Sequence, residues 1–223
     1  RFDSSECEET YVNTTHTEAR EAMVERLRRR GYVDDDRVAE ALRSVPRHEF
    51  VPEGQRSNAY ADRPLSIGSD QTVSAPHMVG MMTELLDPAL DDRVLEVGTG
   101  CGYHAAVTAE TVPEGHVYSV EYDDDLAGEA QARLARLGYG DRVSVRVGDG
   151  REGWDAHAPF DGAYLTCAVP SVPDAVLNQV AVGGRIVAPV GETHQELVRL
   201  EKHDAETVER SEHGGVRFVR IRG

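Results

Sequence analysis

The pattern of apolar and polar positions divides the chain into two parts. From residue 93 onward, short apolar runs alternate with helical stretches. These runs read "RVLEVG", "HVYSVE", "RVSVRV", "FDGAYLTCAV" and "GRIVAPVG". Apolar runs of strand length that alternate with helices are typical of parallel strands buried on both faces. This part therefore predicts an α/β fold with a doubly wound, mostly parallel sheet.

The first part predicts a helical extension that precedes this sheet. Residues 15–33 and residues 34–46 each carry apolar residues at helical spacing, and glycine or proline ends each pattern. Residues 47–73 are rich in proline, glycine and asparagine, so we expect mainly connection there. A further helix is expected to begin at Ser74, because serine before Ala-Pro is typical of a helix start.

The two ends of the chain have weaker patterns. The start is polar and acidic without a period, so residues 1–16 are expected to be a flexible segment. Residues 17–223 are expected to form a single domain, with a helical part over 17–73 and an α/β core over 74–223. At the other end, "ELVRLEKH" and "VRFVRIRG" predict an antiparallel pair of strands.

Charge narrows the partners that this chain can have. Its 223 residues include 24 Lys and Arg against 40 Asp and Glu, a net charge of -16. This excess argues against binding to nucleic acid or to anionic membranes, and "RLRRR" at residues 26–30 is best explained as a solvated helix face. Lys202 is the only lysine. Abundant acids with almost no lysine indicate a protein adapted to high salt.

Cysteine and histidine spacing argues against a metal site. Cys7, Cys101 and Cys167 form no C-x-x-C motif, and the nine histidines show no ligand spacing. A disulfide scaffold is equally improbable, so a reducing, cytoplasmic location is expected. The chain also has no apolar run near the roughly 18 residues of a membrane span, and no signal-peptide pattern.

The most informative segment is "VLEVGTGCGYHAA", in which a strand ends and Gly98, Gly100 and Gly102 precede a helix. Glycines allow a sharp bend and let a ligand approach the backbone N–H groups at the helix start. The nicotinamide fingerprint is G-x-G-x-x-G. Because the third glycine here comes one position early, the segment fits that fingerprint poorly.

Three acids accompany three successive strands: Glu96, Glu121 and Asp149. A carboxylate at the tip of the second strand can bind both hydroxyls of a ribose. Asp149 could accept from the amine of a base, and Glu96 would suit an ammonium and a sulfonium rather than a pyrophosphate. Each acid alone would as readily be an ordinary strand-end residue. In this order, the three predict a site for S-adenosylmethionine.

The chain resembles the protein-L-isoaspartate O-methyltransferase family over roughly residues 20–222. The glycine loop is shared by many methyltransferases, whereas "QTVSAPH" and "GGRIVAPVG" with "QELV" are characteristic of this family. The segments that carry the resemblance are, in order, "VPRHEFVP", "DRPLSIGSDQTVSAPHMV", "VLEVGTGCGYHAAV", "VGDGREGW", "APFDGAYLTCAVPSVPDAVLNQVAVGGRIVAPVG", "QELVRLEK" and "VRFV".

The resemblance implies a Rossmann-like class I methyltransferase that uses S-adenosylmethionine and no metal. Its substrate would be an L-isoaspartyl residue in a damaged protein or peptide. Methylation of the misplaced α-carboxylate would allow a succinimide to form, which starts repair. The part over 17–73 would then supply the substrate-side loop, and the enzyme is expected to be a monomer.

The resemblance also assigns site residues. The catalytic residue would be Ser74, whose hydroxyl and neighbouring N–H groups can bind a carboxylate; because a carboxylate is already ionised, positioning matters more than a general base. Substrate-binding residues would be Gln71, Thr72, Val73, Ser74 and His77. Cofactor-binding residues would be Glu96, Gly98, Thr99, Gly100, Gly102, Glu121, Tyr122, Asp149, Gly150 and Gln195.

Simpler roles and other functions stay open at this point. Ser74 could only cap a helix, His77 could be a packed histidine, and Gln195 an exposed polar residue. Cys101 stands where the family usually has serine, and "LTCAVP" puts Cys167 near the expected pocket wall. Three alternative functions stay open: a relative that methylates one dedicated peptide, a class I methyltransferase with another acceptor, and a non-enzymatic adaptor.

Overall fold

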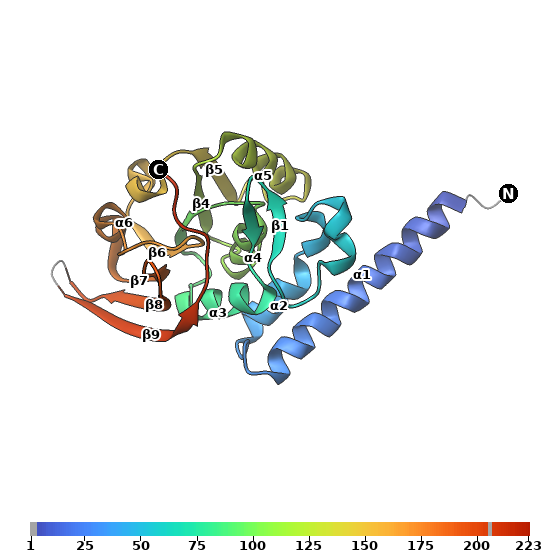
Figure 1. The fold of residues 1–223 in the computed structure, drawn as a ribbon, viewed down its shortest axis with the longest axis horizontal. Helices are drawn as coiled ribbons and strands as arrows, with labels where there is room; N and C mark the ends of the chain where they lie inside the picture. The colour runs from blue at the N-terminus through green and yellow to red at the C-terminus, as the bar shows by residue number, and fades with distance from the viewer. Residues whose placement is uncertain (1–3, 205–206) are drawn as a thin grey trace.

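A seven-stranded sheet lies at the centre of the computed structural model, which describes residues 4–204 and 207–223 (Figure 1). Its strand order is β5-β4-β3-β6-β7-β8-β9. The five strands β5, β4, β3, β6 and β7 are parallel to one another. Strand β8 pairs antiparallel with β7, and β9 pairs antiparallel with β8. The strands are β3 (Arg93–Val97), β4 (His116–Glu121), β5 (Val143–Val147), β6 (Phe160–Leu165), β7 (Val180–Val190), β8 (Gln195–Lys202) and β9 (Val208–Val216). The predicted fold class is confirmed.

Helices cover both faces of this sheet, because alternate residues of each parallel strand are apolar on both sides. In β3, Val94 belongs to one core cluster, and Leu95 and Val97 belong to the other. The first cluster includes α2 (Asp36–Ser44), α3 (Pro76–Leu86) and α4 (Tyr103–Thr111), and the second includes Val176 of α6 (Asp174–Gln179). Helix α5 (Asp124–Arg136) contacts β4 and β5.

The N-terminal helix α1 (Ser4–Arg29) is longer than expected. Residues 1–3 lie outside the described residues, but the predicted flexible segment is helical from Ser4, where the sequence has no proline or glycine to interrupt a helix. Met23, Val24 and Leu27 are fully buried in the same core cluster as Val94 of β3. The N-terminal part of α1 projects away from the rest of the molecule (Figure 1).

A β-hairpin occupies part of the segment that was expected to be connection. It consists of β1 (Leu65–Gly68) and β2 (Gln71–Val73), and the 3₁₀ helices η1 (Arg47–Glu49) and η2 (Glu53–Asn58) precede it. Ser69 and Asp70 form its turn with positive φ angles of 49° and 56°, a conformation that small polar residues tolerate. Strands this short carry too little alternation to be recognised in the sequence.

The prediction of the C-terminal strand pair was correct for only one of its two strands. Strand β8 matches the prediction, but its partner β9 precedes most of the "VRFVRIRG" segment that was expected to pair. Residues 217–223, which we name the C-terminal strap, leave the sheet and pass over the ends of the parallel strands (Figure 1). The Ala168 N–H donates to the Val219 carbonyl at 2.7 Å, and the Ile221 N–H donates to the Ala168 carbonyl at 2.9 Å. In the described part of the chain, no helix is both long and apolar enough to span a bilayer.

Candidate active site

The glycine loop turns sharply between β3 and α4. Gly98, Gly100 and Gly102 have φ angles of 96°, 54° and 86°, which other residues rarely adopt. At Gly98, a Cβ atom would lie only 2.4 Å from Thr166 Oγ1. The Gly100 N–H donates to Glu121 Oε2 at 2.8 Å, so the carboxylate at the tip of β4 is held directly beside the loop.

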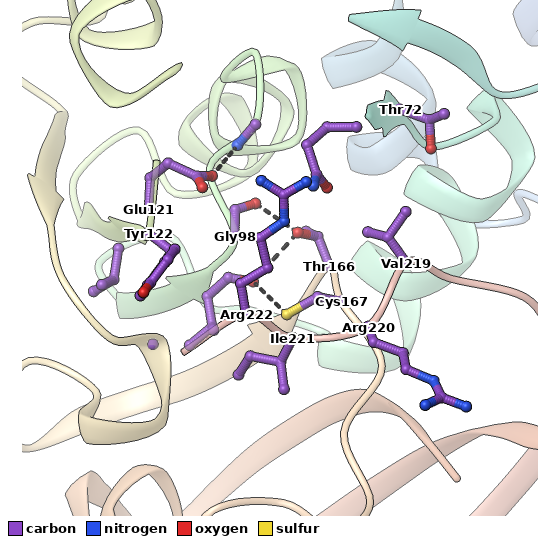
Figure 2. Close-up of a pocket in the computed structure, with 15 residues that line it drawn as sticks. Thr72, Gly98, Glu121, Tyr122, Thr166, Cys167, Val219, Arg220, Ile221 and Arg222 are labelled. Atoms are coloured by element: carbon purple, nitrogen blue, oxygen red, sulfur yellow. Dashed lines mark hydrogen bonds between the residues drawn. The ribbon is translucent and has the colours of Figure 1, made fainter. Parts of the chain in front are cut away.

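A cavity, here the glycine-loop cavity, opens at the carboxyl ends of the parallel strands, where open α/β sheets bind ligands (Figure 2). Five predicted cofactor residues line it: Gly98, Gly100, Glu121, Tyr122 and Gly150. The remaining lining residues are Gln71, Thr72, Val97, Val120, Thr166, Cys167, Val219, Arg220, Ile221 and Arg222.

Glu96 does not fit the predicted contact with the charged groups of a cofactor. Its side chain is fully buried on the α4 side of the sheet, where the hydroxyls of Ser119 and Tyr164 donate to it. Along a strand, side chains alternate between the two faces, so Glu96 points the same way as Val94 and into the core. Burial raises the pKa of the Glu96 carboxyl to about 8.

The other predicted cofactor residues lie outside the lining of the glycine-loop cavity. Thr99 is buried, with Oγ1 2.5 Å from Ser119 Oγ, and Gly102 is the N-cap residue of α4. Asp149 accepts from Arg151 Nη2 at 2.6 Å, and this hydrogen bond lowers the pKa of its carboxyl. Its neighbour Gly150 begins the 3₁₀ helix η3 (Gly150–Glu152) and does line the cavity.

Gln195 acts on the strap rather than at a cavity wall. Its Nε2 donates to the Phe218 carbonyl at 3.1 Å, and its Oε1 accepts from the Phe218 N–H at 2.6 Å. A direct contact with cofactor was expected, but both Nε2 and Oε1 are engaged with Phe218 here. Gln195 therefore fixes the strap where it enters the site.

A second cavity, the Ser74 cavity, adjoins the first. Thr72, Thr166 and Val219 line both cavities and so form their common wall. The remaining residues of the Ser74 cavity are Pro64, Ser74, Ala75, His77, Met78, Gly215, Val216, Arg217 and Phe218. The two cavities bring a predicted cofactor site and a predicted substrate site together.

Ser74 is not the cap of α3. The N-cap residue is Ala75, the helix begins at Pro76, and no side chain caps it. The Ser74 hydroxyl makes no hydrogen bond with any residue that the structure describes, so it is available to a ligand. The Ser74 carbonyl accepts from Nη2 of Arg47 at 2.7 Å, and Arg47 is itself fully buried over the ring of Tyr103.

The other predicted substrate residues differ in their surroundings. His77 lines the Ser74 cavity, but its Nδ1 lies 2.8 Å from Asp62 Oδ1, which fixes the ring. Val73 is buried opposite Leu65 and lines neither cavity. With its amide oxygen turned toward Arg222, Gln71 accepts from Nη2 at 2.8 Å and from Nε at 3.1 Å.

Several residues of the site were not predicted from the sequence. Thr166 Oγ1 donates to the Gly98 carbonyl at 2.5 Å and holds the glycine loop. Arg222 extends from the strap across the glycine-loop cavity (Figure 2). Its Nη2 also donates to the Ser69 carbonyl at 2.7 Å. The sequence signals for these residues were "LTCAVP" with Thr166, "VRFVRIRG" with Arg222, which was predicted to be a strand, and "VPRHEF" with Arg47.

Cys167 lines the glycine-loop cavity, as its sequence position suggested. Burial raises the pKa of its thiol to about 12, so the thiol stays protonated and is a poor nucleophile at neutral pH. Cys101 is buried and lines neither cavity. The described residues contain no group of three or more histidine, cysteine, aspartate or glutamate side chains that could hold a metal ion.

The chain is similar to known proteins over most of its length. The family model described as Protein-L-isoaspartate(D-aspartate) O-methyltransferase (PCMT) matches residues 18–223. A protein-L-isoaspartate O-methyltransferase of Methanopyrus kandleri is 52% identical over 92% of this chain and 92% of its own length. Protein-L-isoaspartate O-methyltransferase 2 of Archaeoglobus fulgidus is 51% identical over 93% of this chain and 94% of its own length.

Solved structures show the same fold. A protein-L-isoaspartate O-methyltransferase structure superposes with a TM-score of 0.85 at 30% identity, over 92% of this chain and 66% of that one. A beta-aspartate methyltransferase (PCMT) from Plasmodium falciparum, solved in complex with S-adenosyl-L-homocysteine, gives a TM-score of 0.80 at 22% identity, over 91% of this chain and 98% of that one. The present chain is an S-adenosylmethionine-dependent O-methyltransferase that acts on L-isoaspartyl residues, and it belongs to the protein-L-isoaspartate(D-aspartate) O-methyltransferase family.

Proposed function

We propose that methyl transfer takes place at the common wall of the two cavities. The observation that carries this proposal is that Thr72, Thr166 and Val219 line both of them. Glu121 would bind the ribose hydroxyls of S-adenosylmethionine in the glycine-loop cavity, and Ser74 would bind the isoaspartyl carboxylate in the other. The cofactor supplies a methyl group on a positively charged sulfur when it is bound.

The residues of the chain need only to position the carboxylate. A carboxylate is ionised at neutral pH, so no side chain has to remove a proton from it. The Ser74 hydroxyl would donate to one carboxylate oxygen and leave the other free to face the methyl group. Arg47 would hold the Ser74 backbone, and Thr166 would hold the Gly98 carbonyl, so both sides of the wall are fixed by hydrogen bonds.

The remaining predicted site residues keep proposed roles of two kinds. Gln71, Thr72 and His77 would contact the substrate peptide, and Val73 would support this segment from the core. Direct cofactor contacts would come from Gly98, Gly100, Glu121, Tyr122 and Gly150. Thr99, Gly102, Asp149 and Gln195 would shape the loop, the η3 turn and the strap around the cofactor.

We further propose a monomeric, cytoplasmic enzyme from a salt-loving organism. The free thiols of Cys101 and Cys167 support a reducing compartment. The net charge of -16 and the single lysine support adaptation to salt. Size-exclusion chromatography with light scattering measures the mass of the protein in solution. A species of twice the mass of the chain would contradict the proposed monomer.

Replacement of Ser74 by alanine tests the proposed site. Since its hydroxyl has no protein partner in the described structure, we expect Ser74→Ala to keep its melting temperature while kcat/KM for an isoaspartyl peptide falls about 100-fold. Methanol released from the methyl ester of the peptide measures the rate, and the same peptide with normal aspartate is the blank.

Ser66→Ala, an exposed position in the same hairpin, is the matched control and should retain full activity. If Ser74→Ala methylates the peptide as fast as the parent enzyme, the carboxylate is not bound by this hydroxyl. A rate that falls only in proportion to lost folded protein would make Ser74 a structural residue.

A further inference from the structure

A groove between α1 and η2, here named the α1 groove, carries net positive charge on an otherwise acidic molecule. Three arginines line it, Arg26, Arg30 and Arg56, against a single carboxylate, Asp62. The chain as a whole has 40 acidic against 24 basic residues. A cationic groove on so acidic a protein marks a place where anionic groups can bind without repulsion.

The positive charges of this groove are incompletely neutralised. Arg26 donates to two backbone carbonyls, those of Tyr60 at 2.9 Å and Ala22 at 3.3 Å, which carry no full charge. Arg30 is 58% exposed, and its Nη1 lies 3.8 Å from Asp62 Oδ2. These guanidinium groups keep the capacity to form hydrogen bonds with carboxylates.

Arg56 completes this set of charges. It forms no ion pair with the residues that the structure describes. The nearby Glu49 carboxylate, whose pKa is lowered mainly by its hydrogen bond from Arg136 and further by Arg56, already lies 2.9 Å from Arg136 Nη2. Arg56 therefore lines the groove beside a carboxylate that Arg136 already binds.

The groove lies next to the Ser74 cavity. Its residues Tyr60, Ala61 and Asp62 are separated only by Arg63 from Pro64, which lines that cavity. Asp62 Oδ1 accepts from the His77 N–H at 3.0 Å and lies 2.8 Å from His77 Nδ1. The pair of Asp62 and His77 thus separates the groove from the site where the isoaspartyl carboxylate would bind.

We infer that the α1 groove is a subsite for acidic side chains that flank the isoaspartyl residue in a substrate protein. This inference rests on the proposed binding of that residue at Ser74. An extended peptide advances about 3.3 Å per residue, so flanking residues leave the cavity within a few positions. Those that pass Asp62 meet Arg30 and Arg56. The enzyme therefore selects damage sites within acidic sequence.

Two matched isoaspartyl peptides test this inference. They share the same core; one carries Asp and Glu on both flanks, and the other carries Asn and Gln. With the parent enzyme at the lowest salt that keeps it folded, we expect KM to be about threefold to tenfold lower for the acidic peptide, with similar kcat. This preference should fall as salt is added.

The double variant Arg30→Gln, Arg56→Gln should lose the preference and treat the neutral peptide as before. Arg210→Gln, an exposed arginine on β9, is the control and should keep it. Equal KM values for the two peptides with the parent enzyme would overturn the inference. So would a double variant in which the preference persists, or in which both peptides weaken equally.

Binding of the labelled acidic peptide, followed by fluorescence anisotropy, separates the two proposals. If the parent enzyme binds this peptide through Arg30 and Arg56 but methylates neither peptide, the groove stands and the reaction site is wrong. If it methylates the neutral peptide normally and binds the acidic one no better, the reaction site stands and the groove inference fails.

Discussion

Glu96 and Glu121 show how much the surroundings of a carboxylate decide its role. Both lie in neighbouring parallel strands next to the glycine loop, and both were expected to contact the cofactor. Glu121 is the last residue of its strand and reaches the loop, where the Gly100 N–H donates to it at 2.8 Å. Glu96 lies one residue before its strand ends, and the pleat turns it into the core beneath α4.

The buried Glu96 should make stability depend on pH. Its pKa rises from 4.5 to about 8 on burial, so between these values the folded protein binds more protons than the unfolded one. Stability contributed by this group therefore falls as the pH rises through this window, by about 1 kcal/mol per pH unit. Glu96→Gln removes the titration, and denaturant unfolding of both proteins from pH 5 to pH 8 measures the difference.

In that comparison the variant should gain stability relative to the parent protein as the pH rises. A constant difference between the two proteins across the window would mean that Glu96 is ionised in the folded state. Glu152→Gln, at an exposed position in η3, is a suitable control and should follow the parent curve.

At the scale of elements, the strap and the hairpin complete the site. The hairpin brings Gln71 and Thr72 to the cavities, and the strap brings Val219 and Arg222. Neither element has a large core of its own. Arg222 joins the two by donating to the Ser69 carbonyl at 2.7 Å, and Gln195 holds the strap at Phe218. These hydrogen bonds add to the packing of Leu65 and Val73 in one core cluster and of the strap against the other.

Loosening the strap should weaken the binding of both the cofactor and the peptide. Gln195→Ala removes two hydrogen bonds to Phe218, each of which contributes about 1 kcal/mol. We expect KM to rise about threefold to tenfold for S-adenosylmethionine and also for the isoaspartyl peptide. Steady-state kinetics with each substrate varied in turn measures both values, and calorimetric titration with S-adenosylhomocysteine checks the cofactor side.

Gln195→Glu is the graded control, since it still accepts from the Phe218 N–H but cannot donate to the Phe218 carbonyl. Its effect should lie between those of the parent and of Gln195→Ala. An effect on the cofactor alone, with the peptide unchanged, would favour the direct cofactor contact that the sequence suggested for this residue.

Local patterns explain which elements could be predicted. The central strands β3, β4 and β6 are largely buried on both faces, so their apolar runs stand out. Strand β9 lies at the edge of the sheet and is largely exposed, and β1 and β2 are only four and three residues long. The glycine loop and Glu121 are local features of strand ends. The strap pairs with Ala168, and lines a cavity together with Gly98 and Cys167, only through the tertiary fold, so its place could not be predicted from sequence spacing.

For the whole molecule, charge is the dominant property. The net charge is -16, so the surplus carboxylates repel one another in dilute buffer, and added salt screens this repulsion. Many ion pairs are exposed and use arginine, as where Arg43 meets Glu21 at 3.1 Å and Glu25 at 2.7 Å. Such pairs contribute little each, so the repulsion among the surplus acids should determine how the protein responds to salt.

The melting temperature should therefore rise steeply between dilute buffer and about 1 M potassium chloride and then level off, because the Debye length has fallen to about 3 Å. Differential scanning calorimetry across this range measures the effect. Sucrose, which is excluded from protein surfaces without screening charge, should not reproduce the steep part. A melting temperature that is the same in dilute buffer and in molar salt would contradict adaptation to salt.

Val219 belongs to the walls of both cavities, and it lies in a segment that hydrogen bonds must hold in place. If the cofactor and the peptide occupy the two cavities as proposed, both contact Val219, so the ligand that binds first should order the strap for the second and give positive cooperativity. Thermodynamic linkage makes the effect reciprocal, so the factor by which peptide tightens S-adenosylhomocysteine must equal the factor by which S-adenosylhomocysteine tightens peptide.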